Sequence, residues 1–523
     1  MTTSAWDTGV ESDGYAGHPG LRYRGAPGSP AELIGATAHF TDRTFLVHGA
    51  RRITYSGFRR ALGPAAEYLT GLGVRPGDRV LLFGFNSPEW VVSLWALWLT
   101  GAIPVLGNRW WGAAEIEHAV TLLQPRHVLT DSGSVFTAPT SALSDLAAAI
   151  DNPTEQEPEP GPQPDPDDPA LILFTSGSSG MPKAVELSGR SVICNQQNIL
   201  GRTNRFPDLI PADAPQVVSL ATTPMFHIGG LSSLVTHFHT GGRIVLGQGR
   251  FDPGQILRLI EAEKIQIWGA VPTMAVRLLE HPDFDRFDLT SLRSWPLGGA
   301  PVSPELLDRI RVKLPNLRRR GLSNTWGMTE AGGFLTVADG RDLLDRPGTV
   351  GRPYPVVELR IDAPDETGTG EVLARSPTVM RGYVGGSEPI IDAEGWLHTG
   401  DLGHLDADGY LYIDGRRKDI VIRGGENIAC PHVEAALTTH PAVVEAAAIG
   451  LPHPDLGEEL AAVVVYRDGD TPPTEDVLRH HLSGLLSSFA IPTRWLIRTT
   501  PLPTLAGEKI DKKSLAAEFP SAG

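Results

Sequence analysis

A chain of 523 residues is too long for a single hydrophobic core, and its composition is that of a globular protein with two to four folding units. The formal net charge of −16 argues against nucleic acid or an anionic membrane surface as a partner. The two cysteines, Cys194 and Cys430, match no disulfide, zinc or CxxC spacing, so we expect reduced thiols in a cytoplasmic protein.

The first 140 residues predict an arm followed by an α/β layer. Residues 1–30 begin with a polar, acidic segment that lacks the apolar core of a secretion signal, and we expect a loosely held arm. Beyond it, residues 58–72 have apolar positions at helical spacing and residues 79–83 read as a buried parallel strand. Residues 91–106 form the longest hydrophobic stretch, but a glycine and a proline interrupt it, which favours a buried helix running into a strand over a membrane span.

Residues 152–168 are rich in proline and acidic residues, so we predict an exposed, mobile crossover between two subdomains. After it, the apolar run 171–174 leads directly into the nonapeptide TSGSSGMPK at 175–183. Two glycines allow its N–H groups to turn toward one centre, four hydroxyls add donors, and a lysine adds positive charge. The spacing is not that of the GxxxxGK[ST] nucleotide loop. The residues predicted to bind a polyanion here are Thr175, Ser176, Gly177, Ser178, Ser179, Gly180 and Lys183.

The pattern of strands and helices continues to about residue 330 and then changes. We expect strands at 184–187, 217–222, 265–270, 293–297 and 322–326, and helices at 188–200, 256–263 and 272–279. Strands that end in glycine-rich turns suit a ligand crevice at the carboxyl edge of a mostly parallel sheet. Beyond residue 349, short alternating strands predict a small β-rich unit, and from Arg416 onward a separate α+β domain of about a hundred residues is expected.

Several polar residues follow these strands at positions suited to nucleotide chemistry. A phosphate loop with a separate carboxylate, Glu330, suggests magnesium held between that carboxylate and the nucleotide. Asp401, which only accepts hydrogen bonds when ionised, could take two ribose hydroxyls. His227 follows an aromatic residue; a structural core histidine is an open alternative for it.

Eight motifs give the chain a family resemblance. TSGSSGMPK, PMFHIGG, LGGAPV, NTWGMTEAG, GEVLARSP, GWLHTGDLG, GRRKDIVIRGGENI and PLPTLAGEKIDKK occur in the order seen in the adenylate-forming enzymes, which include acyl-CoA synthetases, peptide-synthetase adenylation domains and beetle luciferases. The resemblance covers about residues 30 to 515. It implies an adenylation domain at 31–415 that binds ATP and an acid, and a mobile C-terminal domain at 416–523.

The family's two-step reaction would use these residues in turn. A carboxylate attacks the α-phosphate of Mg-ATP and pyrophosphate leaves; the acyl group then passes to a thiol, with CoA as the expected cosubstrate. By motif matching, Lys509 would orient the carboxylate and α-phosphate, and Lys418 would be the hinge about which the C-terminal domain rotates. The other matched positions are Thr329 for the α-phosphate, Glu330 for magnesium, Gly298, Gly299, Ala300, Trp326 and Gly327 for the nucleotide, Asp401 and Arg416 for the ribose, and His227 for the acyl pocket.

Three departures from the family pattern stand out. Glu508 precedes Lys509 where glycine is usual, Trp326 replaces a tyrosine, and Trp110 and Trp111 follow Asn108 where smaller residues are common. We expect adjacent tryptophans to wedge a core or line a site.

The pocket motif favours one class of family member. Gly229 and Gly230 remove side chains from one pocket wall, which suits a flat aromatic or an extended acyl chain, although close backbone packing would also require glycine. No acid follows His227 where amino-acid-activating domains anchor an ammonium group, and no carrier-protein domain follows. The leading hypothesis is a free-standing acyl- or aryl-CoA ligase for a hydrophobic acid. Two alternatives are an enzyme that loads a separate carrier protein, and an ATP-dependent, nitrite-activating diazotase that acts on an aromatic amine.

Overall fold

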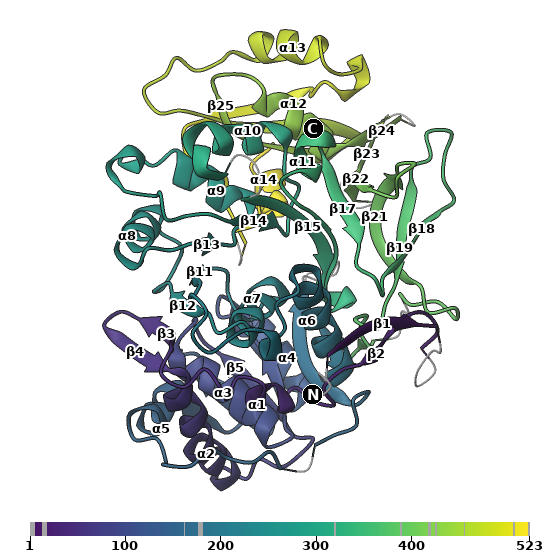
Figure 1. Ribbon diagram of the computed structural model, residues 1–523. Coiled ribbons are helices and arrows are strands. Elements are labelled where there is room, and N and C mark those ends of the chain that lie inside the picture. The colour runs from purple at the N-terminus through teal and green to yellow at the C-terminus, as the bar shows by residue number, and fades with distance from the viewer. Residues whose placement is uncertain are drawn as a thin grey trace.

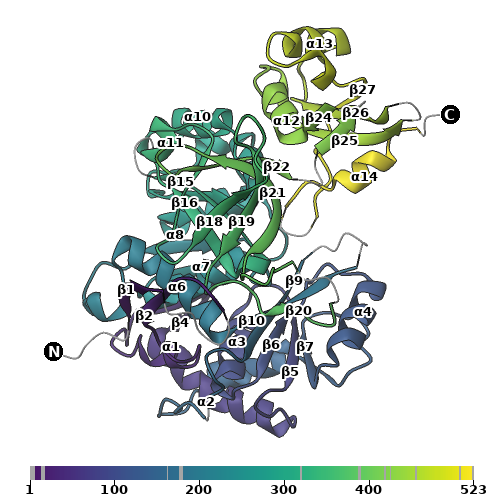
Figure 2. The same ribbon diagram turned by 90° about the vertical axis from the view of Figure 1, so that its right-hand side faces the viewer.

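The structure is a computed structural model that describes residues 6–12, 18–161, 163–175, 181–317, 321–386, 390–416, 420–423, 426–453, 456–505 and 508–520. A large N-terminal part carries sheets of seven, five and eight strands, and a small C-terminal part carries a five-stranded sheet (Figures 1 and 2). This confirms the predicted large α/β domain followed by a small α+β domain.

The seven-stranded sheet holds the predicted polyanion loop at one edge. Its order is β20-β10-β9-β6-β5-β7-β8. The parallel strands are β5 (Arg79–Phe83), β6 (Ile103–Leu106), β7 (His127–Thr130), β8 (Thr140–Ala142) and β9 (Pro169–Thr175). β10 (Lys183–Ser188) and the two-residue β20 (Gly382–Tyr383) add antiparallel neighbours. The loop therefore joins two adjacent antiparallel strands, a pairing that the sequence pattern did not indicate.

The five-stranded sheet is also mostly parallel. Its order is β13-β11-β12-β3-β4, and only β4 runs antiparallel to its neighbour. The strands are β3 (Thr44–His48), β4 (Arg51–Thr54), β11 (Val218–Ala221), β12 (Arg243–Leu246) and β13 (Ile267–Trp268). The predicted strands at 217–222 and 265–270 correspond to β11 and β13.

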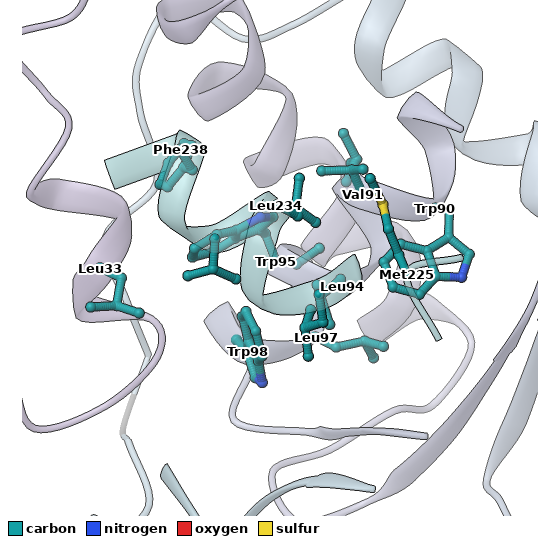
Figure 3. Packing of buried hydrophobic residues seen from close by; sticks show 14 of the residues in the cluster. Leu33, Trp90, Val91, Leu94, Trp95, Leu97, Trp98, Met225, Leu234 and Phe238 are labelled. Atoms are coloured by element: carbon teal, nitrogen blue, oxygen red, sulfur yellow. The ribbon is translucent and has the colours of Figure 1, made fainter. Parts of the chain in front are cut away.

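Helix α3 (Pro88–Leu99) forms the centre of the largest core. The Ser87 hydroxyl caps its first turn by accepting from the Trp90 amide (3.1 Å), and Pro88 occupies the first helical position. All twelve residues are buried, so the helix has no polar face. Figure 3 shows its tryptophans and leucines against Leu234 and Phe238 of α7 (Ile228–His239). The predicted buried helix running into a strand is confirmed as α3 and β6.

The eight-stranded sheet carries most of the remaining site positions. Its order is β14-β15-β16-β17-β22-β21-β19-β18, and all pairs except β14–β15 are antiparallel. The strands are β14 (Trp295–Gly298), β15 (Leu322–Met328), β16 (Gly333–Ala338), β17 (Thr349–Pro353), β18 (Glu358–Asp362), β19 (Gly370–Arg375), β21 (Leu397–Leu405) and β22 (Leu411–Arg416). The predicted β-rich unit is present, but pairing of β16 with β17 joins it to β14 and β15 in one sheet.

The remaining helices of the large part cover these sheets (Figure 1). They are α1 (Glu32–Gly35), α2 (Tyr55–Gly71), α4 (Ala113–Leu123), α5 (Ala147–Asp151), α6 (Gly189–Thr203), α8 (Pro253–Glu263), α9 (Pro272–Leu279), α10 (Pro304–Lys313) and α11 (Asp342–Asp345). Ser188 caps α6 as predicted, since its hydroxyl accepts from the Ser191 amide.

The N-terminal arm is packed rather than loosely held in its described residues. β1 (Asp7–Glu11) and β2 (Arg22–Gly25) form a hairpin, and the Gln197 side chain donates to a backbone carbonyl of each strand at 2.8 Å. Trp6 is buried and stacks on Phe206. The expectation of a loose arm was wrong. It rested on the polar composition of the segment, whereas a single buried tryptophan, Trp6, anchors the arm.

The described residues of the acidic crossover are mostly exposed, and two ion pairs fasten the segment to the large domain. The Arg59 side chain, buried in α2, donates to Glu157 at 2.8 Å. Near the other end, Arg190 binds both carboxylate oxygens of Asp167 at 2.6 and 3.0 Å.

The C-terminal part lies to one side of the large domain in Figure 2 and has its own hydrophobic clusters. It contains β23 (Ile420–Arg423), β24 (Glu426–Ala429), α12 (Cys430–Thr438), β25 (Val443–His453), β26 (Gly457–Tyr466), α13 (Glu475–Ser483), β27 (Arg494–Arg498) and α14 (Lys512–Ala517). Among the described residues, none of the helices is long and apolar enough to cross a membrane.

Candidate functional site

One cavity of about 2300 Å³ gathers every predicted site residue that the structure describes. It lies between the large domain and the C-terminal domain and extends into the large domain. The predicted residues that line it are Thr175, Lys183, His227, Gly298, Gly299, Ala300, Trp326, Gly327, Thr329, Glu330, Asp401, Arg416 and Lys509. Ser176, Gly177, Ser178, Ser179, Gly180 and the predicted hinge Lys418 lie outside the described residues.

The base of the polyanion loop presents a hydroxyl and a cation. Thr175 ends β9 and Lys183 begins β10, and the two residues are cross-strand partners. The Lys183 ammonium lies 5.1 Å from the centre of the Tyr383 ring. The lysine and the electron-rich face of the ring attract each other, and the lysine makes this end of the cavity favourable for an anion.

Tyr383 is a site residue that the sequence reasoning missed. Its hydroxyl donates to Glu330 Oε1 at 2.8 Å, and the Glu330 side chain is buried beside it. Burial and the Glu330 carboxylate raise the pKa of Tyr383, so the phenol stays protonated and remains a donor. Its strand β20 has only two residues, too short for any periodic signal; only its pairing with β10 brings it to the site.

Glu330 suits a magnesium ion. Its Oε1 accepts from the Tyr383 phenol, and a carboxylate offers the hard oxygen ligands that magnesium prefers. No cluster of three or more metal-ligating side chains occurs within the described ranges, so an ion here would take its other ligands from phosphate oxygens and water. That is the usual ligand set of magnesium in nucleotide sites.

Asp401 and Arg416 face each other across β21 and β22. They are cross-strand partners, and the Arg416 Nε donates to Asp401 Oδ1 at 2.7 Å. The indole N–H of Trp326 donates to the other carboxylate oxygen at 2.7 Å. The tryptophan that replaces the family's tyrosine thus fixes the buried carboxylate.

The turn after β14 requires glycine at two positions. A Cβ at Gly298 would lie 2.5 Å from the Thr325 hydroxyl, because β14 and β15 approach closely there. Gly299 has φ +76°, in the left-handed region that favours glycine. The turn continues into Ala300, so its backbone borders the cavity directly.

Lys509 reaches this turn from the C-terminal domain. A Cβ placed on Gly299 would lie 3.9 Å from Lys509 Cε. The lysine side chain is open to the cavity, yet protein surrounds it. Loss of bulk water and the positive Arg416 lower the pKa of Lys509, while Glu330 and Asp401 oppose that shift. The two carboxylates therefore partly offset the loss of water and the repulsion from Arg416.

The aromatic wall of the cavity explains the paired tryptophans. Trp110 lies between Phe85 and Phe226, at centroid distances of 5.8 and 5.3 Å, and lines the cavity. Trp111 is buried and packs edge-on against Phe174 in the core. Trp111 also lines the cavity, so both tryptophans border the site, and Trp111 in addition wedges the core. His227, 4.7 Å from the Phe226 ring, also lines the cavity, which favours the pocket role over the core alternative.

Neither cysteine fits a catalytic thiol. Cys194 and Cys430 are both buried, and neither is in a disulfide. Burial raises the pKa of Cys194 to about 12, which leaves it protonated at neutral pH.

Comparisons with known proteins agree with this arrangement. Residues 35–384 match the AMP-binding enzyme family, and residues 432–505 match the AMP-binding enzyme C-terminal domain. A feruloyl-CoA synthase from Amycolatopsis is 32% identical over 519 residues, which cover 95% of this chain and 100% of that protein.

Two solved structures of the Bacillus subtilis o-succinylbenzoate CoA synthetase share the fold. The complex with its acyl-adenylate intermediate has a TM-score of 0.78 and 28% identity, and the alignment covers 94% of this chain and 98% of that one. The complex with ATP and a magnesium ion has a TM-score of 0.76 and 27% identity, covering 92% and 98%. The family models match both domains, and the relatives cover nearly the whole chain. The chain therefore belongs to the AMP-binding enzyme family and, within it, to the AMP-forming acyl- and aryl-CoA ligases.

Proposed function

We propose that this protein adenylates a hydrophobic fatty or aromatic carboxylic acid with ATP and then transfers the acyl group to the thiol of CoA. The observation that carries this proposal is the position of Lys509. A lysine from the small domain lies in the same cavity as Lys183, Glu330 and Asp401 of the large domain. That arrangement suits the adenylation step.

Adenylation brings one anion to another. The substrate carboxylate forms a bond to the α-phosphorus, and the bond to the β-phosphate oxygen breaks as pyrophosphate leaves with its electron pair. Lys183 of the large domain and Lys509 of the small domain supply positive charge to the same cavity, and Thr329 adds a hydroxyl to its wall. Magnesium, held by Glu330, would neutralise charge on the phosphate oxygens.

Thioester formation needs the same site with a different partner. The CoA thiol loses its proton and attacks the acyl carbonyl, the C–S bond forms, and AMP leaves as the C–O bond breaks. By its match to the family, Lys418 is the hinge for this step. Rotation there withdraws Lys509 and brings the segment near residues 423–426 to the thiol entrance.

The pocket wall supports an extended or flat acid. A Cβ on Gly229 would meet nothing within 4 Å, so the first turn of α7 opens onto free space. A Cβ on Gly230 would lie 2.3 Å from the Pro224 carbonyl oxygen, so this glycine serves backbone packing. Ser233 and Thr236 continue the cavity wall along α7. The acyl groups in the names of the two relatives, feruloyl and succinylbenzoate, contain an aromatic ring, which supports an aromatic acid.

The test is pyrophosphate release from ATP with a panel of acids, with and without CoA, followed by mass spectrometry. The panel holds octanoic, benzoic and ferulic acids, phenylalanine and nitrite with an aromatic amine. An acyl-CoA product from octanoic, benzoic or ferulic acid is expected. Transfer only to an added carrier protein, or consumption of nitrite and amine without acyl-CoA, would replace the proposal by one of its two alternatives. The cytoplasmic location, expected from two reduced thiols, stays a prediction that fractionation of the native cells tests.

A further inference from the structure

Arg277 of α9 joins the large domain to the segment that carries Lys509. Its Nη1 donates to Glu508 Oε2 at 2.6 Å, and its Nη2 donates to the Leu502 carbonyl at 3.1 Å. Its Nε lies 3.7 Å from Glu445 Oε1. The second oxygen of Glu445 accepts from the Leu502 amide at 2.9 Å, so one arginine meets three linked groups of the C-terminal domain.

The contact is better shielded from water than a second ion pair between the same domains. The side chains of Arg277, Glu508 and Glu445 are 23%, 21% and 10% exposed. Arg467 pairs with Glu280, the residue after α9, at 3.1 Å, but its side chain is 53% exposed. Because solvent screens exposed charges more strongly, the Arg277 contacts are expected to dominate.

Glu508 occupies a backbone conformation that explains why it needs a partner. Its φ is +62°, in the left-handed region that residues other than glycine rarely adopt. The Thr504 hydroxyl donates to the same carboxylate oxygen as Arg277, at 3.2 Å. The Glu508 amide donates to the Leu505 carbonyl, and the Leu505 amide donates to the Lys509 carbonyl. Glu508 thereby fixes the turn from which Lys509 projects.

We propose that Arg277 is a positioning residue that holds Lys509 in its adenylation position through Glu508, and that this contact must break before the thioester-forming step. The inference rests on the proposed two-step function and adds a residue pair that governs the change between its steps. Because the Arg277–Glu508 contact is ionic, higher salt should weaken it and shift the domain arrangement away from the one used for adenylation.

The first experiment compares the two half-reactions in Arg277→Gln, Glu508→Gln and the double variant. Octanoic and ferulic acids are the probes for acid-dependent exchange of pyrophosphate into ATP, and their chemically prepared adenylates with CoA are the probes for thioester formation. Each single change should slow pyrophosphate exchange about tenfold. The double variant should be no slower than the single variants, because all three lose the same Arg277–Glu508 interaction. Thioester formation should stay within about twofold of wild type.

Arg467→Gln is the matched control, since it removes an ion pair between the same two domains without touching Glu508. It should leave both half-reactions within about twofold of wild type, as expected for an exposed pair.

The second experiment measures the domain arrangement without any acid. Spin labels on cysteines placed at Val312 of α10 and Val477 of α13, which are 73% and 47% exposed, report the distance between the two domains. The native cysteines are buried and should not react. With ATP and magnesium, we expect one narrow distance in the parent and a second, different distance in the Arg277→Gln and Glu508→Gln variants.

An unchanged distance in both variants, or an equal loss of both half-reactions, would overturn the role of Arg277. If instead no acid supports exchange in the wild type, the proposed function fails. The label distances then still decide whether Arg277 holds the domains together.

Discussion

At the scale of single residues, Tyr383 is expected to set the affinity of the site for magnesium. Tyr383→Phe removes the donor to Glu330, a hydrogen bond to a charged group. The half-saturating magnesium concentration for pyrophosphate release should rise, and kcat/KM for ATP should fall about tenfold. A magnesium titration at fixed ATP measures both.

Tyr410→Phe is the matched control for that change. Tyr410 donates to Asp342 at 2.8 Å outside the cavity, so the variant loses the same kind of bond elsewhere. An unaltered magnesium dependence in Tyr383→Phe would contradict the role given to this phenol.

Substitutions at Gly229 and Gly230 should have contrasting effects, the first on binding of the acid and the second on stability. Leucine at Gly229 enters open space, so the variant should melt within a few degrees of wild type while KM for long acids rises at least tenfold and KM for ATP is unchanged. Alanine at Gly230 meets the Pro224 carbonyl and should instead lower the melting temperature. Equal KM values for octanoic acid in wild type and Gly229→Leu would exclude this wall from the acid pocket.

Sequence motifs located many of these residues but not their interactions. The residues of the polyanion loop base, Glu330, Asp401 and Lys509 all meet in one cavity. Tyr383, Arg277 and the Trp326–Asp401 bond were not predicted, because each joins segments far apart in the chain. The sequence shows that Glu508 stands where the family has glycine, but neither its left-handed backbone nor its arginine partner was predicted.

At the scale of elements, the last turn of α7 makes stability depend on pH. His239 is fully buried, and neither ring nitrogen has a hydrogen-bond partner among the residues that the structure describes. Burial lowers its pKa from 6.5 to about 3. Below about pH 6.5, His239 therefore binds a proton in the unfolded chain but not in the folded protein. The free energy of unfolding falls as the pH drops from there toward 3.

Replacing His239 with leucine should flatten that slope by roughly 1 kcal/mol per pH unit between pH 6 and 5. Urea denaturation at several pH values measures it, with the exposed His432→Gln as control. A slope identical to that of wild type would show that other groups carry the acid sensitivity.

Elements with strong periodicity were predicted well and those held by long-range pairing were not. The helix at 272–279 and the strand at 79–83 match α9 and β5 end to end. Helix α7 was missed, because two glycines and β-branched residues weaken its helical signal. Strand β10 pairs antiparallel with β9 and with the distant β20. A pattern of hydrophobic residues does not predict either pairing.

At the scale of the whole molecule, we propose that the domain boundary lies at Arg416 and that residues 1–415 fold alone. Their hydrophobic clusters are separate from those of the C-terminal domain. The fragment should unfold cooperatively and bind an ATP analogue, yet release no pyrophosphate because it lacks Lys509. Calorimetry and the release assay test this, and an active fragment would remove Lys509 from the mechanism.

The two-residue strand β20 also bears on how the chain is made. It covers the outer edge of β10, yet about 200 residues separate the two in sequence. At roughly 5–20 residues per second, the ribosome delivers that cover about 10–40 s after β10 emerges. For that interval the seven-stranded sheet has an open edge at β10, whose unpaired backbone groups can pair with another chain, so we expect chaperones to protect it during synthesis.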